Sequence, residues 1–223
     1  MKIWKLVLAL GVLLAAAARS DAGSIAITDL YNTGVDAAHN PLANGAIDNH
    51  YTLSTNPSGV TTPIVYRNPA WVANAPASGS DLAAQWIAPS SSSVPDGTYT
   101  YTTSFTLGAG ALIPSVEIGG RFTADDQIIN VYLNGHALGI GTSGDEIYGH
   151  WFNFSIANSA YFLAGTTNYL AFETKNTHGS VNGLIVQMTG SYNAVPEPAS
   201  VAMMGLGGVA ALAFGRRRIK ARA

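Results

Sequence analysis

The chain has 223 residues and no cysteine, and its five histidines are scattered. The lack of cysteine excludes disulfides, thiolate zinc sites and cysteine nucleophiles, so core packing must supply the stability. Between residues 23 and 197, three basic residues stand against twelve acidic ones, which gives this stretch a net charge of −9. An acidic surface repels phosphate backbones, so we expect no nucleic-acid partner and favour neutral sugars or cations.

Residues 1–22 have the order of a secretory signal peptide. Two lysines precede an apolar run over residues 6–18, and small residues follow it. Cleavage after Ala18 or after Ala22 fits this pattern, and we favour the bond between Ala22 and Gly23. A retained membrane anchor is the alternative, but the apolar run is short for that role. We therefore predict that the chain is exported.

Residues 23–193 are predicted to form a single all-β domain. Apolar residues recur with a period of two, most clearly over 99–107, 116–122, 152–156 and 184–188. A helical period does not persist for ten residues anywhere in this stretch. Many short strands separated by proline and glycine breakers indicate a two-sheet β-sandwich, with a jelly roll as the favoured topology.

The pair Asn134-Gly135 predicts a tight hairpin. It follows an apolar strand pattern over 128–133, and a second strand is expected over 136–140. A type I′ turn needs a positive φ at both central residues, and asparagine followed by glycine meets that need at low cost.

Several segments of the predicted domain resemble the galactose-binding-like jelly rolls. The segments in its second half are 122–126, 131–135, 152–154, 163–165 and 168–172. With weaker matches before them, the resemblance covers residues 31–192. It implies the fold, while this superfamily contains sugar binders, adhesins and accessory modules alike, so it implies no catalytic residues.

Trp71 and Trp151 are candidate sugar-stacking residues, and Asn134 and Asn176 are candidate partners of the sugar hydroxyls. Packing in the core is the alternative for Trp71, as it is for Trp86. Trp151 follows a polar loop, which favours a position at the rim of the sandwich. These residues support a hypothesis of carbohydrate binding.

Four acidic residues are candidate Ca²⁺ ligands, namely Asp125, Asp126, Asp145 and Glu146. The spacing of an EF-hand loop is missing, and solvated loop acids are the alternative interpretation. No other cofactor is expected.

Nothing in the sequence predicts a catalytic centre. The chain contains neither an H-E-x-x-H nor a G-x-S-x-G motif. Glu117 and Glu173 each alternate with core residues, so both are expected to face outwards from a sheet. We therefore predict a binding protein rather than an enzyme. A polysaccharide-active enzyme and a purely structural matrix protein without a ligand are the alternatives.

The C-terminal segment 194–223 has three parts in a defined order. They are the tripeptide Pro196-Glu197-Pro198, a predicted transmembrane helix over 201–215, and a cationic tail over 216–223 that contains Arg216, Arg217 and Arg218. The apolar part reaches about 21 to 26 Å, which is short for a hydrocarbon core of about 30 Å. Positive flanks stay on the cytoplasmic side, so the domain is expected outside the membrane.

This arrangement resembles the PEP-CTERM sorting signal of Gram-negative bacteria. The resemblance implies recognition by exosortase, an inner-membrane cysteine protease-transpeptidase, and a cut near residues 196–198. It also implies a transient stay in the membrane, followed by delivery to the cell surface or to extracellular polysaccharide. The two prolines hold the backbone extended, which suits a protease substrate. A plain tail anchor is the alternative.

Overall fold

The computed structural model describes residues 23–76, 81–157 and 160–194. Within these residues, 24–194 form one compact unit. Its strands are β1 (Ser24–Ala26), β2 (Thr52–Thr55), β3 (Ile64–Val65), β4 (Ile87–Ala88), β5 (Gly97–Thr106), β6 (Glu117–Asp125), β7 (Gln127–Leu133), β8 (His136–Ala137), β9 (Phe152–Ala157), β10 (Thr167–Asn176) and β11 (Gly183–Asn193). Two 3₁₀ turns are η1 (Ile113–Ser115) and η2 (Ile147–Gly149).

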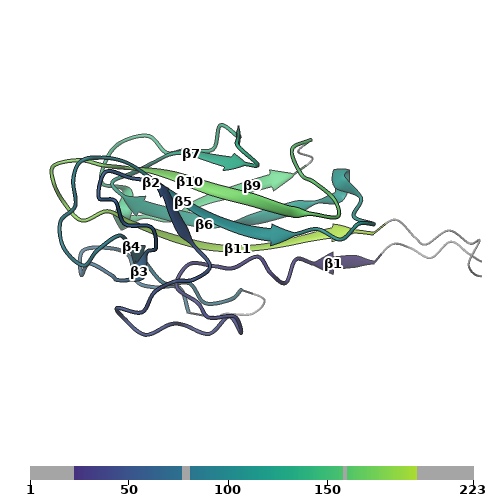
Figure 1. The fold of residues 1–223 in the computed structure, drawn as a ribbon, viewed down its shortest axis with the longest axis horizontal. Helices are drawn as coiled ribbons and strands as arrows, with labels where there is room; N and C mark the ends of the chain where they lie inside the picture. The colour runs from purple at the N-terminus through teal and green to yellow at the C-terminus, as the bar shows by residue number, and fades with distance from the viewer. Residues whose placement is uncertain (1–22, 77–80, 158–159, 195–223) are drawn as a thin grey trace, which may run out of the picture. The chain divides into compact units, whose positions relative to one another are not determined.

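The strands form two sheets that pack face to face (Figure 1). The first sheet has the order β3-β4-β11-β6-β9, and β1 also pairs with β11. The second sheet has the order β2-β5-β10-β7-β8. All these pairs are antiparallel. The all-β sandwich is confirmed and agrees with a jelly roll, whereas the galactose-binding-like relationship stays a prediction.

Alternation along each strand sorts side chains between the core and the outer face. In β5, Tyr99, Tyr101 and Phe105 are buried, while Ser104 and Thr106 between or beside them are exposed. Threonine and aromatic residues suit this half-buried surface because their side chains pack well on a pleated sheet. The same rule decides which residues of the first sheet can face solvent.

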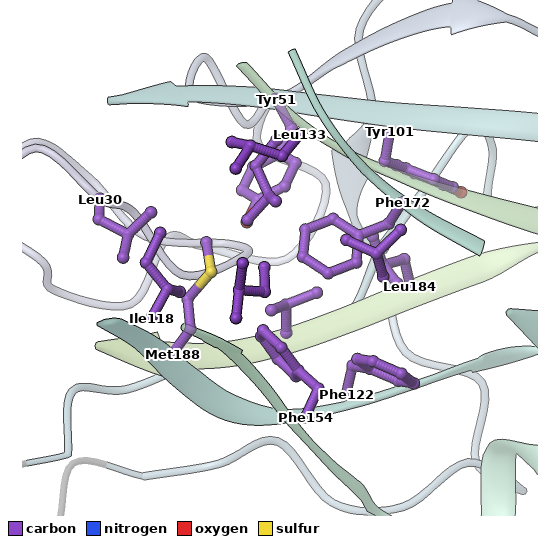
Figure 2. Packing of buried hydrophobic residues seen from close by; sticks show 14 of the residues in the cluster. Leu30, Tyr51, Tyr101, Ile118, Phe122, Leu133, Phe154, Phe172, Leu184 and Met188 are labelled. Atoms are coloured by element: carbon purple, nitrogen blue, oxygen red, sulfur yellow. The ribbon is translucent and has the colours of Figure 1, made fainter. Parts of the chain in front are cut away.

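Aromatic side chains from both sheets meet in the middle of the sandwich. Phe122 of β6 and Phe154 of β9 come from the first sheet, and Phe172 of β10 comes from the second (Figure 2). The Phe172 ring lies 6.3 Å from that of Phe122 and 6.1 Å from that of Phe154, both edge to face. This geometry is favoured for aromatic pairs, and burial of these rings stabilises the fold.

The predicted hairpin is confirmed between β7 and β8. Asn134 and Gly135 have φ values of 52° and 82°, as a type I′ turn requires. The second strand is shorter than expected, because β8 ends at Ala137 rather than at residue 140. Gly139 adopts a φ of 69°, which turns the chain out of the strand direction.

The first strand and the end of the last strand lie side by side (Figure 1). Ser24 pairs with Asn193, and Ala194 forms an isolated bridge with Ala111. The chain is therefore held by pairing up to the residue before Val195. The predicted signal peptide at 1–22 and the predicted transmembrane helix at 201–215 lie outside the described residues. Within the described part, no helix has the length and apolar character needed to cross a membrane.

Candidate ligand-binding site

A row of polar side chains crosses the outer face of the first sheet. Arg121 on β6 pairs in register with Asn153 on β9 and with Gln187 on β11. Their neighbours Phe122, Phe154 and Val186 are core residues, so these three side chains point to the outer face. The row lines a pocket of about 230 Å³. The other lining residues are Asp81, Gly119, Gly120, Met188 and Thr189.

The pocket is hollow beside Arg121 because the adjacent row of paired residues on β9, β6 and β11 has small side chains. Gly119 pairs with Ser155 on one side and with Thr189 on the other. Gly119 has no side chain to fill the space, and the nearest atom to a Cβ placed there would be the Phe154 backbone oxygen at 3.9 Å. The pocket thus results from a glycine at an outward position of a central strand.

Arg121 is held in place from two sides. Its Nε donates a hydrogen bond to Oε1 of Gln187 over 2.7 Å. Its guanidinium carbon lies 4.5 Å from the centre of the Trp151 ring, which is a cation–π contact. Gln187 is only 4% exposed, and its amide nitrogen donates to the Leu82 carbonyl over 2.8 Å. The guanidinium is therefore oriented before any ligand arrives.

The segment that carries Asp81 is fixed to β11 by Asn32. The side-chain nitrogen of Asn32 donates to the carbonyls of Leu82 and Ala83, each over 3.1 Å. Its oxygen accepts a hydrogen bond from the Met188 backbone N–H over 2.8 Å. Asp81 itself is exposed and lines the pocket.

Trp151 is half-buried. It follows η2 and packs against a small aromatic cluster on the same outer face. Trp71 and Trp86 form the centre of this cluster, with ring centroids 4.4 Å apart. It covers Ile185 of β11.

Trp71 lies inside this cluster rather than at the pocket. It is 2% exposed, and its indole N–H donates to Oδ2 of Asp125 over 2.7 Å. Trp86 is fully buried, and its indole N–H donates to the Val72 carbonyl over 2.9 Å. Both indoles thus occupy the packing position that the sequence offered as the alternative to sugar stacking.

Asn134 and Asn176 lie apart from Trp151 and hold the backbone. The Asn134 side chain donates to the Tyr161 carbonyl over 2.7 Å and accepts from the Tyr169 N–H over 2.8 Å. Asn176 is 1% exposed and donates to the Val94 carbonyl over 3.1 Å. The structure does not bring these two amides together with Trp151.

The candidate calcium ligands Asp125 and Asp126 are buried. Oδ2 of Asp126 accepts hydrogen bonds from the backbone N–H and the hydroxyl of Thr177, both over 2.6 Å. Burial, together with the neighbouring Asp126 carboxyl, raises the pKa of Asp125 to about 8. A raised pKa favours the protonated carboxyl, which is a weaker metal ligand than a carboxylate.

The other two candidate ligands, Asp145 and Glu146, are exposed. Asp145 lies 4.0 Å from Nζ of Lys175. Among residues 23–76, 81–157 and 160–194, no three acidic, histidine or cysteine side chains gather as a metal site would require. The calcium hypothesis stays a prediction.

Trp151, which lies against Arg121, was predicted as a ligand contact, whereas the residues that line the pocket were not. Alternation around Phe122 and Phe154 places Arg121 and Asn153 on outward positions, and Arg121 is one of three basic residues between 23 and 197. These signals were present in the sequence. The pairing of β9, β6 and β11, which brings the side chains together, was not.

Residues 194–218 match the PEP-CTERM protein-sorting motif. The chain carries a PEP-CTERM sorting motif. This motif indicates export and exosortase-dependent sorting to the cell surface. Its predicted recognition residues, Pro196 to Pro198 and Arg216 to Arg218, lie outside the described residues.

A comparison with curated proteins found no match. Among solved structures, the chain is similar to an arabinose-bound MgGH51 α-L-arabinofuranosidase, with 14% identity and a TM-score of 0.36. The match covers 74% of this chain and 30% of that one.

Proposed function

We propose that the exported sandwich is a non-catalytic carbohydrate-binding module that associates with extracellular polysaccharide. The observation that carries this proposal is the pocket at which Arg121 stacks on Trp151 beside Asn153 and Gln187. Trp151 holds the guanidinium in place, and amides and guanidinium groups suit the oxygen atoms of sugars. Few convergent polar groups in a concave site beside an aromatic ring are typical of a ligand site.

Sorting supports the same conclusion. A PEP-CTERM motif indicates a protein that exosortase delivers to the surface. We propose that the tag is cut near residues 196–198 at the inner membrane of a Gram-negative bacterium, after a transient stay in the bilayer. A domain delivered to the cell surface is in a position to contact extracellular polysaccharide.

A polysaccharide-active enzyme is the second candidate. Hydrolysis of a glycosidic bond ordinarily requires two carboxyl groups about 5 to 9.5 Å apart. The lining of the pocket contains one carboxylate, that of Asp81. This lining favours binding over hydrolysis.

The test uses the mature protein isolated from the exporting cells and the polysaccharide of the same cells. We expect affinity electrophoresis to show retardation by the polysaccharide, without release of reducing ends. Trp151→Ala and Asn153→Ala should each weaken the retardation. Tyr169→Ala is the matched control, because Tyr169 is 55% exposed on β10 of the other sheet.

The results separate the candidates. Reducing ends released by the wild type but not by Asp81→Asn would favour the enzyme. No retardation of the folded wild type, with or without Ca²⁺, would favour a structural matrix protein without a ligand. Thermal unfolding of each variant shows whether a loss of binding reflects a loss of folding.

A further inference from the structure

Arg121 differs from the other basic residues of the described domain in the partners of its side-chain nitrogen atoms. Arg67 donates to the carbonyls of Trp71 and Val72, over 2.6 and 2.9 Å. Lys175 lies 4.0 Å from the Asp145 carboxylate. Arg121 uses only its Nε, and within residues 23–76, 81–157 and 160–194 its two terminal nitrogens have no acceptor.

The unused donors of Arg121 form a fork. A guanidinium has five N–H donors in one plane, and the two terminal nitrogens match the two oxygens of a carboxylate. Gln187 fixes that plane through Nε, and Trp151 covers one of its faces. Because the group is already oriented, a carboxylate that binds it loses little additional side-chain entropy.

The charges of the groups that line the pocket indicate which ligand charge it favours. The remaining lining groups are uncharged apart from Asp81, which is exposed. In a domain with so few cations, a fixed guanidinium in a pocket attracts an anion locally, although the domain as a whole is acidic. The volume of about 230 Å³ lies below the range of about 300–1,000 Å³ for drug-sized ligands, so one sugar unit is the expected occupant.

From these observations we infer that the pocket recognises an acidic sugar, a uronic acid unit of a polysaccharide, whose carboxylate binds the two terminal nitrogens of Arg121. The inference rests on the proposed carbohydrate-binding function and adds the class of sugar. The bidentate contact is charge-assisted and sits at a partly open site, so salt screens it. Binding therefore weakens as ionic strength rises.

The test measures the affinity of the full mature protein for polygalacturonate, for alginate, for carboxyl-reduced polygalacturonate and for neutral dextran. We expect binding to at least one of the two acidic polymers at low salt and at least tenfold weaker binding to the carboxyl-reduced and neutral ones. Arg121→Gln should lose at least tenfold in affinity for the acidic polymer. Arg121→Lys should retain part of it, because a point charge remains while the fork is lost.

A second variant guards against a loss of folding in Arg121→Gln. Asn153 is exposed and pairs in register with Arg121, so Asn153→Asp places a carboxylate where it can occupy the fork from inside the protein. It should weaken binding of the acidic polymer while unfolding at the temperature of the wild type. Tyr169→Asp is its control, because it adds the same charge at an exposed position of the other sheet.

The outcomes are distinguishable. Equal affinity for polygalacturonate and its carboxyl-reduced form, or an unchanged affinity in both Arg121→Gln and Asn153→Asp, overturns the uronate inference and leaves carbohydrate binding in place. Binding to dextran but to neither acidic polymer does the same. Failure to bind any of the four polymers or the cells' own polysaccharide overturns both the inference and the proposed function.

Discussion

The indole N–H of Trp71, at the centre of the outer aromatic cluster of the first sheet, donates to Oδ2 of Asp125 over 2.7 Å, and both side chains are buried. Burial raises the pKa of Asp125 to about 8, and the adjacent Asp126 carboxyl acts in the same direction. The hydrogen bond from Trp71 opposes this rise without cancelling it. The folded protein therefore holds a proton that the unfolded chain releases near pH 4.

The first prediction is a loss of stability as pH rises. The pKa of Asp125 is higher in the folded protein than in the unfolded chain. Its contribution to the free energy of unfolding is therefore complete below about pH 4 and is lost progressively up to about pH 8. Asp48, whose pKa burial raises to about 6, acts with the same sign over a narrower window. Burial lowers the pKa of His50, which acts in the opposite direction up to about pH 6.5, so urea unfolding should give a free energy of unfolding that decreases between pH 7 and 8.

Asp125→Asn isolates the contribution of Asp125. Its amide oxygen can still accept the Trp71 N–H, while the titrating proton is removed. The variant should show a shallower decline than the wild type, mainly between pH 6 and 8. Parallel curves for the two proteins would contradict the assignment.

Gly120 and Gly119 form a matched pair for the second prediction. A Cβ at Gly120 would lie 2.1 Å from the Gln187 carbonyl oxygen and 2.7 Å from the Met188 Cα, which are backbone atoms of the central strand β11. Gly120→Ala should therefore destabilise the protein by about 1–3 kcal/mol or more. Gly119→Ala should change stability by no more than about 0.5 kcal/mol, because its Cβ meets nothing closer than 3.9 Å. Equal stability losses in chemical unfolding would show that β6 and β11 do not approach as described.

The third prediction concerns the turn residue Asn134. Asn134→Ala removes its hydrogen bonds to the Tyr161 carbonyl and the Tyr169 N–H, and it places alanine at a φ of 52°. We expect a loss of about 2 kcal/mol or more in thermal unfolding. Asn134→Gly keeps the backbone freedom and should lose about 1 kcal/mol less than alanine. Alanine as stable as glycine would contradict a role for the left-handed turn.

The fourth prediction concerns sorting. The intact mass of the surface form should correspond to a chain that ends near Glu197 and begins at Gly23. Neutral replacement of Arg216, Arg217 and Arg218, or replacement of Pro196 and Pro198, should change where the protein is found. A surface form that retains the arginines would contradict processing at the motif.

The fifth prediction concerns calcium. Asp125 and Asp126 accept hydrogen bonds within the protein, and Asp145 lies near Lys175. We expect the same unfolding temperature in calcium chloride and in EDTA. A clearly higher temperature in calcium, abolished in Asp126→Asn, would favour the calcium hypothesis instead.

Local patterns in the sequence were sufficient to predict some features of the structure. The alternation in 99–107 and 184–188 corresponds to β5 and β11, and Asn134-Gly135 makes the turn that its φ values allow. The order of the three parts of the C-terminal segment was sufficient to predict the sorting motif over 194–218. These features depend on neighbours within a few residues, so the sequence carries them directly.

Other features exist only once distant strands are paired. Arg121 and Gln187 are 66 positions apart, and Trp71 and Asp125 are 54 apart, yet each pair shares a hydrogen bond. The sequence left Trp71 open between the core and a sugar site, and only the packing over Ile185 shows that it is buried, whereas Trp151 lies beside Arg121. The reason is physical: strand periodicity states which side a residue faces, whereas the order of strands in the sheet decides which residues it meets there.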